Sequence, residues 1–298
     1  MKWLTILLLL TPLAALSAEE SDRAINERQQ APLDGRVEVS NISGEVKVSG
    51  WDEPAIEITG TLGRGVERLD FVRDGNLTVI EVVYPKNGRN SGGSYLHIRI
   101  PRASSLEVAA VSAPIRVKGV QGPQRLKTVS GDISTEAFTG DVEAETVSGD
   151  LTVSGTDTAI HTLLKTVSGS IETTAVSGDL EASTISGGIE SSGSMLSRAI
   201  LSTTSGRITL EAGLTDPGRF DLSTTNGRIR LMLDQDADLD LDAQTFNGSI
   251  KNCFGVEASK DRYTPERTLR LQNGEADRKV RIRSMNGGID VCAESLSG

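Results

Sequence analysis

The chain has 298 residues, and its 41 acidic residues against 31 lysines and arginines give a formal net charge of −10. Nucleic-acid binding needs a basic surface, so we expect no nucleic-acid partner. Aromatic residues make up only 3% of the chain, which leaves few rings on which sugars could stack.

Residues 1–18 are typical of a secretory signal peptide. Lys2 precedes an almost wholly apolar run from Trp3 to Leu16, and Ser17 and Ala18 supply small residues at the cleavage point. The run is short for a membrane-spanning helix, although an uncleaved anchor is the alternative. We therefore expect an exported protein, periplasmic or at the cell surface or secreted, with no membrane span after cleavage.

The next two segments precede the regular part of the chain. Residues 19–34 are polar and predict a disordered linker. Residues 35–110 predict an N-terminal β-cap with the first coils, because strand patterns at 55–59, 77–83 and 95–100 flank a hairpin signal at Asp74-Gly75.

Residues 111–298 are dominated by a repeated motif: a small hydroxyl residue, an apolar or small residue, Ser or Asn, Gly, any residue, then Ile or Leu. Its eight glycines are Gly131, Gly149, Gly169, Gly187, Gly206, Gly227, Gly248 and Gly287, separated by 18 to 21 residues except for a last interval of 39. A fixed period near 20 residues indicates stacked repeats. The fold predicted is all-β, a single-stack β-solenoid with coils of 18–21 residues, and the long interval predicts an inserted loop at 254–278.

Each coil contains two short stretches that alternate between apolar and polar residues. The positions seven and five before the glycine, and the Ile or Leu two after it, predict inward-facing side chains. The hydroxyl residue three before the glycine predicts a vertical ladder in which each side chain bonds its neighbour in the next coil. The glycine itself suits a bend between two strands.

The two cysteines occupy equivalent positions. Cys253 and Cys292 each lie five residues after a repeat glycine. Parallel strands of neighbouring coils lie about 4.8 Å apart, within the range that a disulfide spans. In an exported chain this predicts a Cys253–Cys292 disulfide, with two buried thiols as the alternative.

One acidic cluster runs from Asp234 to Asp242. Hard cations are bound by several carboxylates, so Asp234, Asp236 and Asp238 are candidates for a calcium site. No other metal site and no cofactor is predicted.

The repeat register favours a second interpretation of the same cluster, a ladder of ion pairs between coils. Aligning the coils on their glycines places Asp242 opposite Arg281. It also places Asp240 opposite Lys279 on the next coil and Arg219 on the coil before. Opposite charges facing each other across parallel strands stabilise the pairing.

The residue directly after the repeat glycine changes its charge along the chain. In order, this position holds Asp132, Asp150, Ser170, Gly188, Arg207 and Arg228. One interpretation is an ordinary solvated surface. The other is a polarised interaction face, for which Asp132, Asp150, Arg207 and Arg228 are the candidate residues.

The sequence offers little sign of catalysis. The two histidines, His97 and His161, have no second His or Cys at metal-ligand spacing. The cysteines are better explained by bridging than by nucleophilic attack, and there is no Gly-x-Ser-x-Gly elbow or phosphate-binding loop. We therefore expect no enzymatic activity.

The chain resembles the toast-rack family of bacterial exported proteins, candidate adhesins of unknown function. The resemblance lies in the Val-Ser-Gly-Asp-Ile repeats, in Gly50-Trp51-Asp52, and in Ile98-Arg99-Ile100-Pro101, and it covers about residues 35–292. It implies a β-solenoid with a role in the cell envelope and supplies no catalytic residues.

The function predicted is a non-enzymatic adhesion or interaction module at the bacterial cell envelope, with an envelope protein or a glycan as partner. Two alternatives stay open. A polysaccharide-active β-helix enzyme would need clustered carboxylates on one face, and a self-associating structural or signalling component would form oligomers.

Overall fold

The computed structural model describes residues 21–85, 91–233, 238–275 and 277–291. These residues form 24 strands and no helix, which confirms the all-β prediction. In the described ranges there is accordingly no helix that could span a membrane.

The strands and their bounds are as follows: β1 (Arg23–Gln30), β2 (Arg36–Trp51), β3 (Ala55–Leu62), β4 (Arg68–Asp74), β5 (Leu77–Val83), β6 (Ser94–Pro101), β7 (Ser105–Ser112), β8 (Ile115–Lys118), β9 (Gln124–Lys127), β10 (Ile133–Glu136), β11 (Val142–Glu145), β12 (Leu151–Ser154), β13 (Ala159–Lys165), β14 (Ile171–Thr174), β15 (Ser177–Ser186), β16 (Ile189–Ser205), β17 (Ile208–Asn226), β18 (Ile229–Met232), β19 (Leu239–Asn247), β20 (Ile250–Asn252), β21 (Ser259–Lys260), β22 (Arg267–Asn273), β23 (Arg278–Asn286) and β24 (Ile289–Val291).

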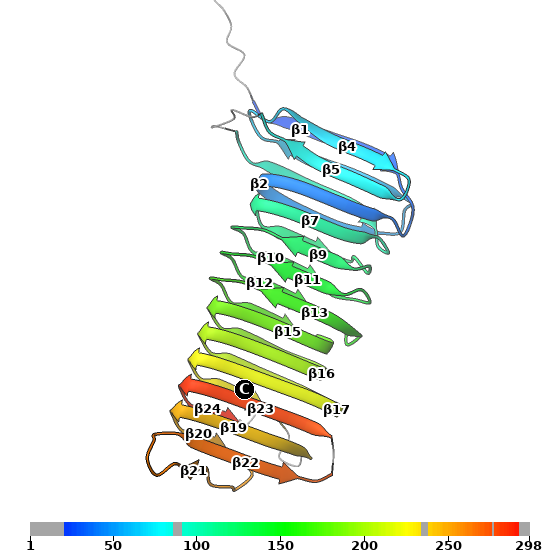
Figure 1. The fold of residues 1–298 in the computed structure, drawn as a ribbon. Helices are drawn as coiled ribbons and strands as arrows, with labels where there is room; N and C mark the ends of the chain where they lie inside the picture. Colours follow the sequence, from blue (N-terminus) through cyan, green and yellow to red (C-terminus); the bar gives the residue numbers. More distant parts are fainter. Residues whose placement is uncertain (1–20, 86–90, 234–237, 276, 292–298) are drawn as a thin grey trace, which may run out of the picture.

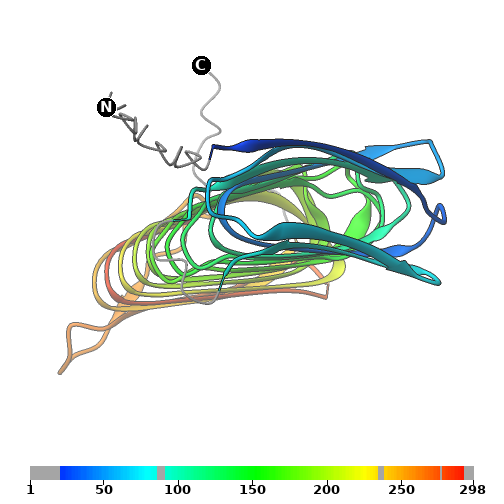
Figure 2. The same cartoon turned by 90° about the horizontal axis from the view of Figure 1, so that it is seen from above.

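The strands stand in two facing columns, and the chain winds from one to the other (Figures 1 and 2). One column has the order β4-β5-β2-β7-β9-β11-β13-β15-β16-β17-β23-β19-β22. The other has the order β1-β3-β6-β2-β8-β10-β12-β14-β16-β17-β18-β24-β20. The long strands β2, β16 and β17 bend from one column into the other. Within the stack the pairing is parallel, and the antiparallel pairs lie at its two ends.

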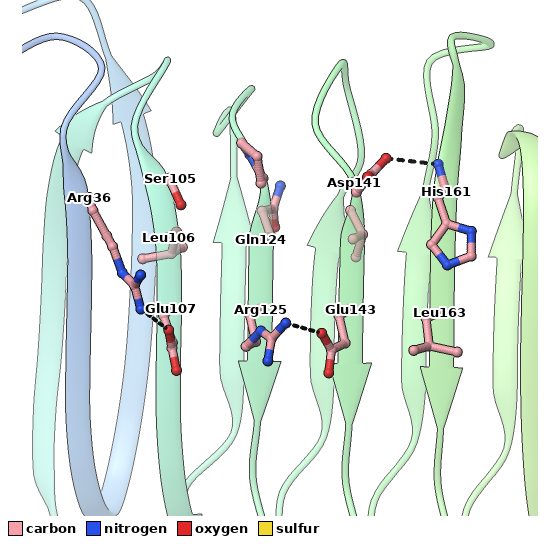
Figure 3. A pocket seen from close by; sticks show the side chains of 12 residues that line it. Arg36, Ser105, Leu106, Glu107, Gln124, Arg125, Asp141, Glu143, His161 and Leu163 are labelled. Atoms are coloured by element: carbon pink, nitrogen blue, oxygen red, sulfur yellow. Dashed lines mark hydrogen bonds and ion pairs between the residues drawn. The ribbon is translucent and has the colours of Figure 1, made fainter.

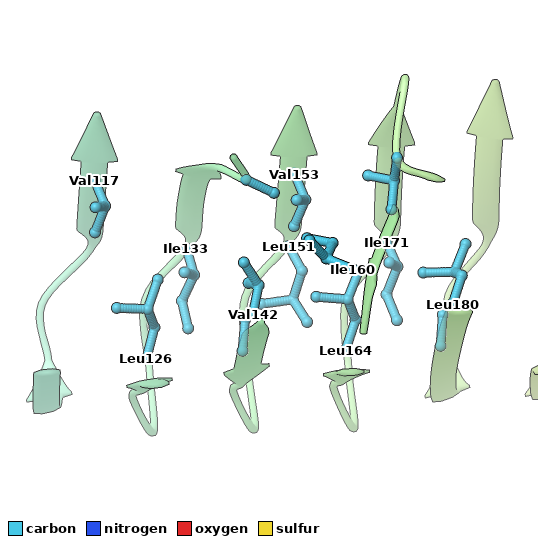
Figure 4. Close-up of a cluster of buried hydrophobic side chains, with 14 of the residues drawn as sticks. Val117, Leu126, Ile133, Val142, Leu151, Val153, Ile160, Leu164, Ile171 and Leu180 are labelled. Atoms are coloured by element: carbon cyan, nitrogen blue, oxygen red, sulfur yellow. The ribbon is translucent and has the colours of Figure 1, made fainter. Parts of the chain in front are cut away.

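The apolar side chains of each winding point into the space between the columns. Figure 4 shows Ile133, Leu151 and Ile171 on one side facing Leu126 and others on the opposite side. The Ile or Leu two after the repeat glycine is buried in seven of the eight copies, and Ile250 near the end is half-buried. Equivalent residues lie directly over one another, as in the pairs Ile133 with Leu151 and Leu151 with Ile171. Burial of this continuous aliphatic column is the main stabilising contribution.

The windings at both ends are not stacked in sequence order. At the N-terminal end β2 lies between β5 and β7, so the first winding is enclosed by two later ones. At the C-terminal end β23 lies between β17 and β19, so the last winding is inserted between the two windings that precede it in the sequence. The prediction that Asp240 faces Arg219 is therefore wrong. Asp240 faces Lys279, and Lys279 in turn faces Arg219.

The predicted linker and the predicted inserted loop both contain strands. In the loop, alternation at 268–271 already indicates an extra strand, and β22 includes these residues. Residues 23–30 of the predicted disordered linker form β1, which pairs antiparallel with β3 over eight residues. The predicted inserted loop at 254–278 contains β21 and β22, and β22 pairs antiparallel with β19. Strands β1 and β22 each cover an end of a column, where backbone N–H and C=O groups would otherwise be unpaired, and β21 pairs with β22. That hydrogen bonding explains why polar sequences are ordered there.

Candidate interaction face

The repeat motif lies where the chain turns from the first column into the second. We define the turn edge as the four-residue segments 129–132, 147–150, 167–170, 185–188, 204–207, 225–228, 285–288 and 246–249, written here in their order along the stack. The arrowheads of β15, β16, β17 and β23 end at this edge, on the left in Figure 1. Three residue steps separate the first and fourth Cα atoms of a segment, so each segment adds one narrow rung about 10 Å wide.

The repeat glycine is required because stacked backbones approach closely there. A Cβ added to Gly206 would lie 1.8 Å from the carbonyl oxygen of Gly187, and one added to Gly227 would lie 1.7 Å from that of Gly206. The adjacent Gly188 is different, since its nearest atom would be 3.4 Å away. Of the eight repeat glycines only Gly187 has a positive φ, of 158°, so close packing and not left-handed backbone is what these positions share.

The hydroxyl residue of the motif bonds the glycine carbonyl of a neighbouring winding. Thr146 Oγ1 donates to Gly131 O at 3.1 Å, and Thr166 Oγ1 donates to Gly149 O at 3.1 Å. The predicted hydroxyl-to-hydroxyl ladder is therefore wrong. Each buried threonine instead satisfies a carbonyl that the close approach leaves facing inward, which explains why hydroxyl residue and glycine recur together.

The second residue of the motif forms an exposed apolar column along the turn edge. Its hydrophobic side chains are 41–55% exposed, which is unusual for apolar residues at regular spacing. In stack order, with two further members at the start, one from β2 and one from β7, the column consists of Ile42, Val111, Val129, Val147, Val167, Ile185, Thr204, Thr225, Met285 and Phe246. All are large hydrophobic residues except the two threonines. Sequence reasoning missed this column, although the position was visibly apolar in the motif.

The Ser or Asn of the motif forms a second exposed column beside the first. Successive serines from Ser130 to Ser186 pair as parallel bridges. Further along, Asn247 Nδ2 donates to Asn286 Oδ1 at 3.0 Å, and Asn286 Nδ2 donates to Asn226 Oδ1 at 2.9 Å. The asparagines follow the order of the interleaved windings, so they hold the inserted last winding on both sides.

The structure brings the four predicted face residues into one exposed column. Asp132 Oδ1 accepts the N–H of Asp150 at 3.0 Å, and Asp150 Oδ1 accepts the N–H of Ser170 at 2.7 Å. The acidic residues thus also bridge neighbouring windings. Arg228 lies 3.8 Å from Asp290 on the inserted winding. Arg207 is exposed and has no ion pair with any residue of the described ranges.

The charge along this column therefore reverses from one end to the other. Two carboxylates occupy one half and two guanidinium groups occupy the other, with Ser170 and Gly188 between them. Both central residues are small. The turn edge as a whole combines an exposed apolar column, a flat polar column and a column whose charge changes sign.

A polar groove of about 660 Å³ lies on the outer surface of the first column, over β7, β9, β11 and β13 (Figure 3). Its carboxylates already have partners. Arg36 bonds Glu107 at 2.7 Å, and Arg125 lies 2.8 Å from Glu143. The carboxylate of Asp141 accepts the backbone N–H of His161 at 3.0 Å.

The other histidine, His97, lies away from this groove, on β6 opposite Thr59 of β3.

Ion pairs link the windings near the predicted ladder. Asp240 faces Lys279, as predicted, whereas Asp242 forms its ion pair with a residue other than the one predicted. Asp242 and Arg281 face each other in register, as predicted. The Asp242 carboxylate, however, lies 2.9 Å from Arg283 Nη2, and Arg281 lies 4.0 Å from Asp221. The pKa of Lys279 is raised, first through its hydrogen bond with Asp277.

Two further predicted sites involve residues outside the described ranges. Asp234 and Asp236 of the calcium candidate lie there, and the described residues, which include Asp238, contain no cluster of three metal-binding side chains. Cys292 also lies there. The register pairs Asn252 with Val291, the residues directly before the two cysteines, and the disulfide stays a prediction.

Comparison with known protein families identifies the family of the chain. The profile of the Toastrack DUF4097 family matches residues 34–199 and, again, residues 186–292. The chain belongs to this family. The match confirms the resemblance to the toast-rack proteins, and its two overlapping parts agree with a chain built from repeats.

Three solved structures are similar to this Toastrack chain at low identity. One is a candidate cell adhesion protein from Clostridium sporogenes, at 12% identity and a TM-score of 0.27, covering 90% of this chain and 99% of that one. Another is a candidate lipid-binding protein from Parabacteroides distasonis, at 13% and 0.44, covering 92% and 97%. The third is a candidate adhesin from Bacteroides fragilis, at 14% and 0.38, covering 91% and 98%. No curated protein matches the chain.

Proposed function

We propose that this Toastrack protein is an exported, non-enzymatic β-solenoid that serves as an interaction module of the bacterial cell envelope, and that the turn edge is its binding face. The observation that supports this is the exposed apolar column. Regularly spaced aliphatic side chains in water have an unfavourable hydration free energy, and contiguous apolar surface on a soluble protein often marks a binding site.

The structure of the turn edge supports binding through a preformed, rigid surface. The rungs are held by the glycine packing and by threonine hydrogen bonds, so the exposed columns are fixed in position before a partner arrives. A rigid face loses little conformational entropy on binding. The reversing charge column beside the apolar one would orient the partner along the stack.

The experiment is capture from cell-envelope extracts by the chain from residue 19 onwards. Val147→Lys with Val167→Lys places two charges in the middle of the apolar column and should abolish capture. Thr152→Lys with Thr174→Lys is the matched control, because it adds the same charge to exposed positions on β12 and β14 of the same windings. Equal capture by both double variants would show that the turn edge is not the binding face.

The groove in Figure 3 is the site that a polysaccharide-active enzyme, the alternative function, would use. Glycoside cleavage uses a pair of carboxylates, one of them protonated. Here Glu107 and Glu143 are ion-paired with Arg36 and Arg125, and the Asp141 carboxylate accepts a backbone N–H, so each of the three carboxylates already has a partner within the chain. Release of reducing ends from cell-envelope polysaccharides by the purified chain would contradict the non-enzymatic proposal.

A further inference from the structure

We propose that the partner of the turn edge is a second copy of this chain, bound antiparallel to form a two-fold dimer. This rests on the proposed function, since it names the occupant of the same face. The argument comes from the sign pattern of the charged column and from the order in which the windings stack.

The charge column is complementary to itself when reversed. Consecutive rungs are about 4.8 Å apart, and the column has its midpoint between Ser170 and Gly188. Asp150 and Arg207 stand at equal distances on either side of that midpoint, as do Asp132 and Arg228. A second copy running in the opposite direction therefore places each Asp against an Arg.

A two-fold axis that lies in the interface, perpendicular to the stack, produces this arrangement. Each copy then presents the same patch to the other, as an isologous contact requires. It forms two Asp150–Arg207 contacts and two Asp132–Arg228 contacts per dimer. The parallel arrangement instead opposes Asp132 to Asp132 and Arg228 to Arg228, so the charges favour only the antiparallel one.

The apolar column is also compatible with the antiparallel two-fold arrangement. Reversal about the same midpoint brings apolar residues together at the centre and at both ends, and leaves an aliphatic residue against a threonine in between. The pairs are Val167 with Ile185, Val147 with Thr204, Val129 with Thr225, Val111 with Met285, and Ile42 with Phe246. The inserted winding sets the end pairs, because β23 precedes β19 in the stack.

The middle of the edge allows close approach. Ser170, with a small side chain, and Gly188, with none, lie on either side of the axis. Glu172 and Glu190 lie two residues further along the chain, on the outer faces of β14 and β16, where like charges would meet. The contact is therefore confined to the edge and does not spread over the flat surface of the second column.

The size of the edge predicts a weak dimer. The eight segments together with the rungs of Ile42 and Val111 make ten rungs. At about 4.8 Å for each rung and a width of about 10 Å, they give on the order of 900 Å² buried by both copies together. Stable interfaces bury about 1,200 Å² or more. We therefore expect a reversible dimer that dissociates on dilution and is weakened by salt, because exposed ion pairs are screened.

The test is sedimentation equilibrium of the chain from residue 19 onwards, over a range of concentrations, with charge-reversed variants. Asp150→Arg opposes two arginines to two arginines, and Arg207→Asp opposes two carboxylates to two carboxylates. Each should weaken the homodimer about tenfold or more. An equimolar mixture of the two variants should dimerise nearly as well as the parent, since every contact across the heterodimer is again Asp with Arg.

Two control variants carry the same charge changes away from the edge. Glu211→Arg and Arg198→Asp lie at exposed positions on β17 and β16, and should leave the dimer unchanged. The Asp150 carboxylate also accepts the N–H of Ser170, so the fold of its variant is checked by circular dichroism. If that variant does not fold, Arg207→Asp and Val167→Lys, which remove no hydrogen bond within the chain, must still weaken the dimer.

The outcomes separate the two proposals. A parent chain that stays monomeric at all concentrations overturns the dimer. If capture from extracts still depends on Val147 and Val167, the turn edge remains supported as the interaction face, with a partner other than a second copy. A dimer that neither single variant weakens, or that mixing does not restore, overturns the antiparallel arrangement.

Discussion

Substitution of one repeat glycine by alanine tests the packing of the turn edge most directly. In Gly206→Ala the new Cβ would overlap the carbonyl oxygen of Gly187, 1.8 Å away, so the two windings must separate. Overpacking of this kind costs about 1–3 kcal/mol. The same oxygen accepts a hydrogen bond from Thr203 Oγ1 at 3.1 Å, and its loss adds about 1 kcal/mol.

The chain supplies a matched control, Gly188, in the neighbouring winding of the turn edge. Gly188→Ala places its Cβ 3.4 Å from the nearest atom, at ordinary contact distance. Removing glycine also lowers the conformational entropy of the unfolded chain, which stabilises by about 0.4–1 kcal/mol in both variants. We therefore expect Gly206→Ala to lower the free energy of unfolding by about 2–3 kcal/mol and Gly188→Ala to leave it unchanged or slightly higher.

Urea denaturation followed by circular dichroism measures both variants under the same conditions. The change in midpoint is compared at constant slope, because a stacked-repeat protein can lose cooperativity between its windings. Equal midpoints for Gly206→Ala and Gly188→Ala would refute the packing explanation of the repeat glycine. A loss in Gly188→Ala as large as that in Gly206→Ala would point to backbone flexibility as the reason for both glycines.

Three more predictions concern other parts of the chain. Ile189, 1% exposed in the middle of the stack, should not tolerate aspartate, and Ile189→Asp should lower stability by several kcal/mol or prevent folding; a thermal melt like that of the parent would contradict the inward position. Reduction of the predicted Cys253–Cys292 disulfide should lower the free energy of unfolding by up to about 4 kcal/mol, and an unchanged urea midpoint, or two free thiols in the unreduced protein, would rule the disulfide out. Backbone N–H groups hold the pKa of Asp261 below its ordinary value of 3.8, so the order they give the turn at 261–264 should be complete at neutral pH and decrease as pH falls through the lowered pKa. An NMR titration of this carboxyl with a midpoint at or above 3.8 would contradict that prediction.

The local structure of a winding could be predicted from the sequence because it depends on short-range patterns. Alternation identified the inward residues, and alignment on the glycines gave the register between most neighbours, such as Ile171 with Ile189. The role of the glycine was only partly predictable. Its need for a Cβ-free backbone was visible, but the close carbonyl that makes the need absolute belongs to another winding.

The candidate face was predicted as a set of residues, but its extent was not. The reversing charge from Asp132 to Arg228 follows from the glycine alignment alone. The exposure of the apolar column does not, because a regularly repeated valine in a β-strand pattern is more often buried. Only the bend at the turn edge decides that Val147 faces water while Ala144 and Leu151 face the core.

The amino-acid sequence is sufficient to predict that the chain is all-β, which residues belong to each winding, and which side chains of a winding face inward. These properties depend on residues within one repeat of about 20 residues. The tertiary structure decided which windings touch. The order at the ends, with β2 between β5 and β7 and β23 between β17 and β19, depends on hydrogen bonding between distant segments. Every winding carries the same motif and offers the same strand edges, so the motif cannot specify which neighbour a terminal winding takes.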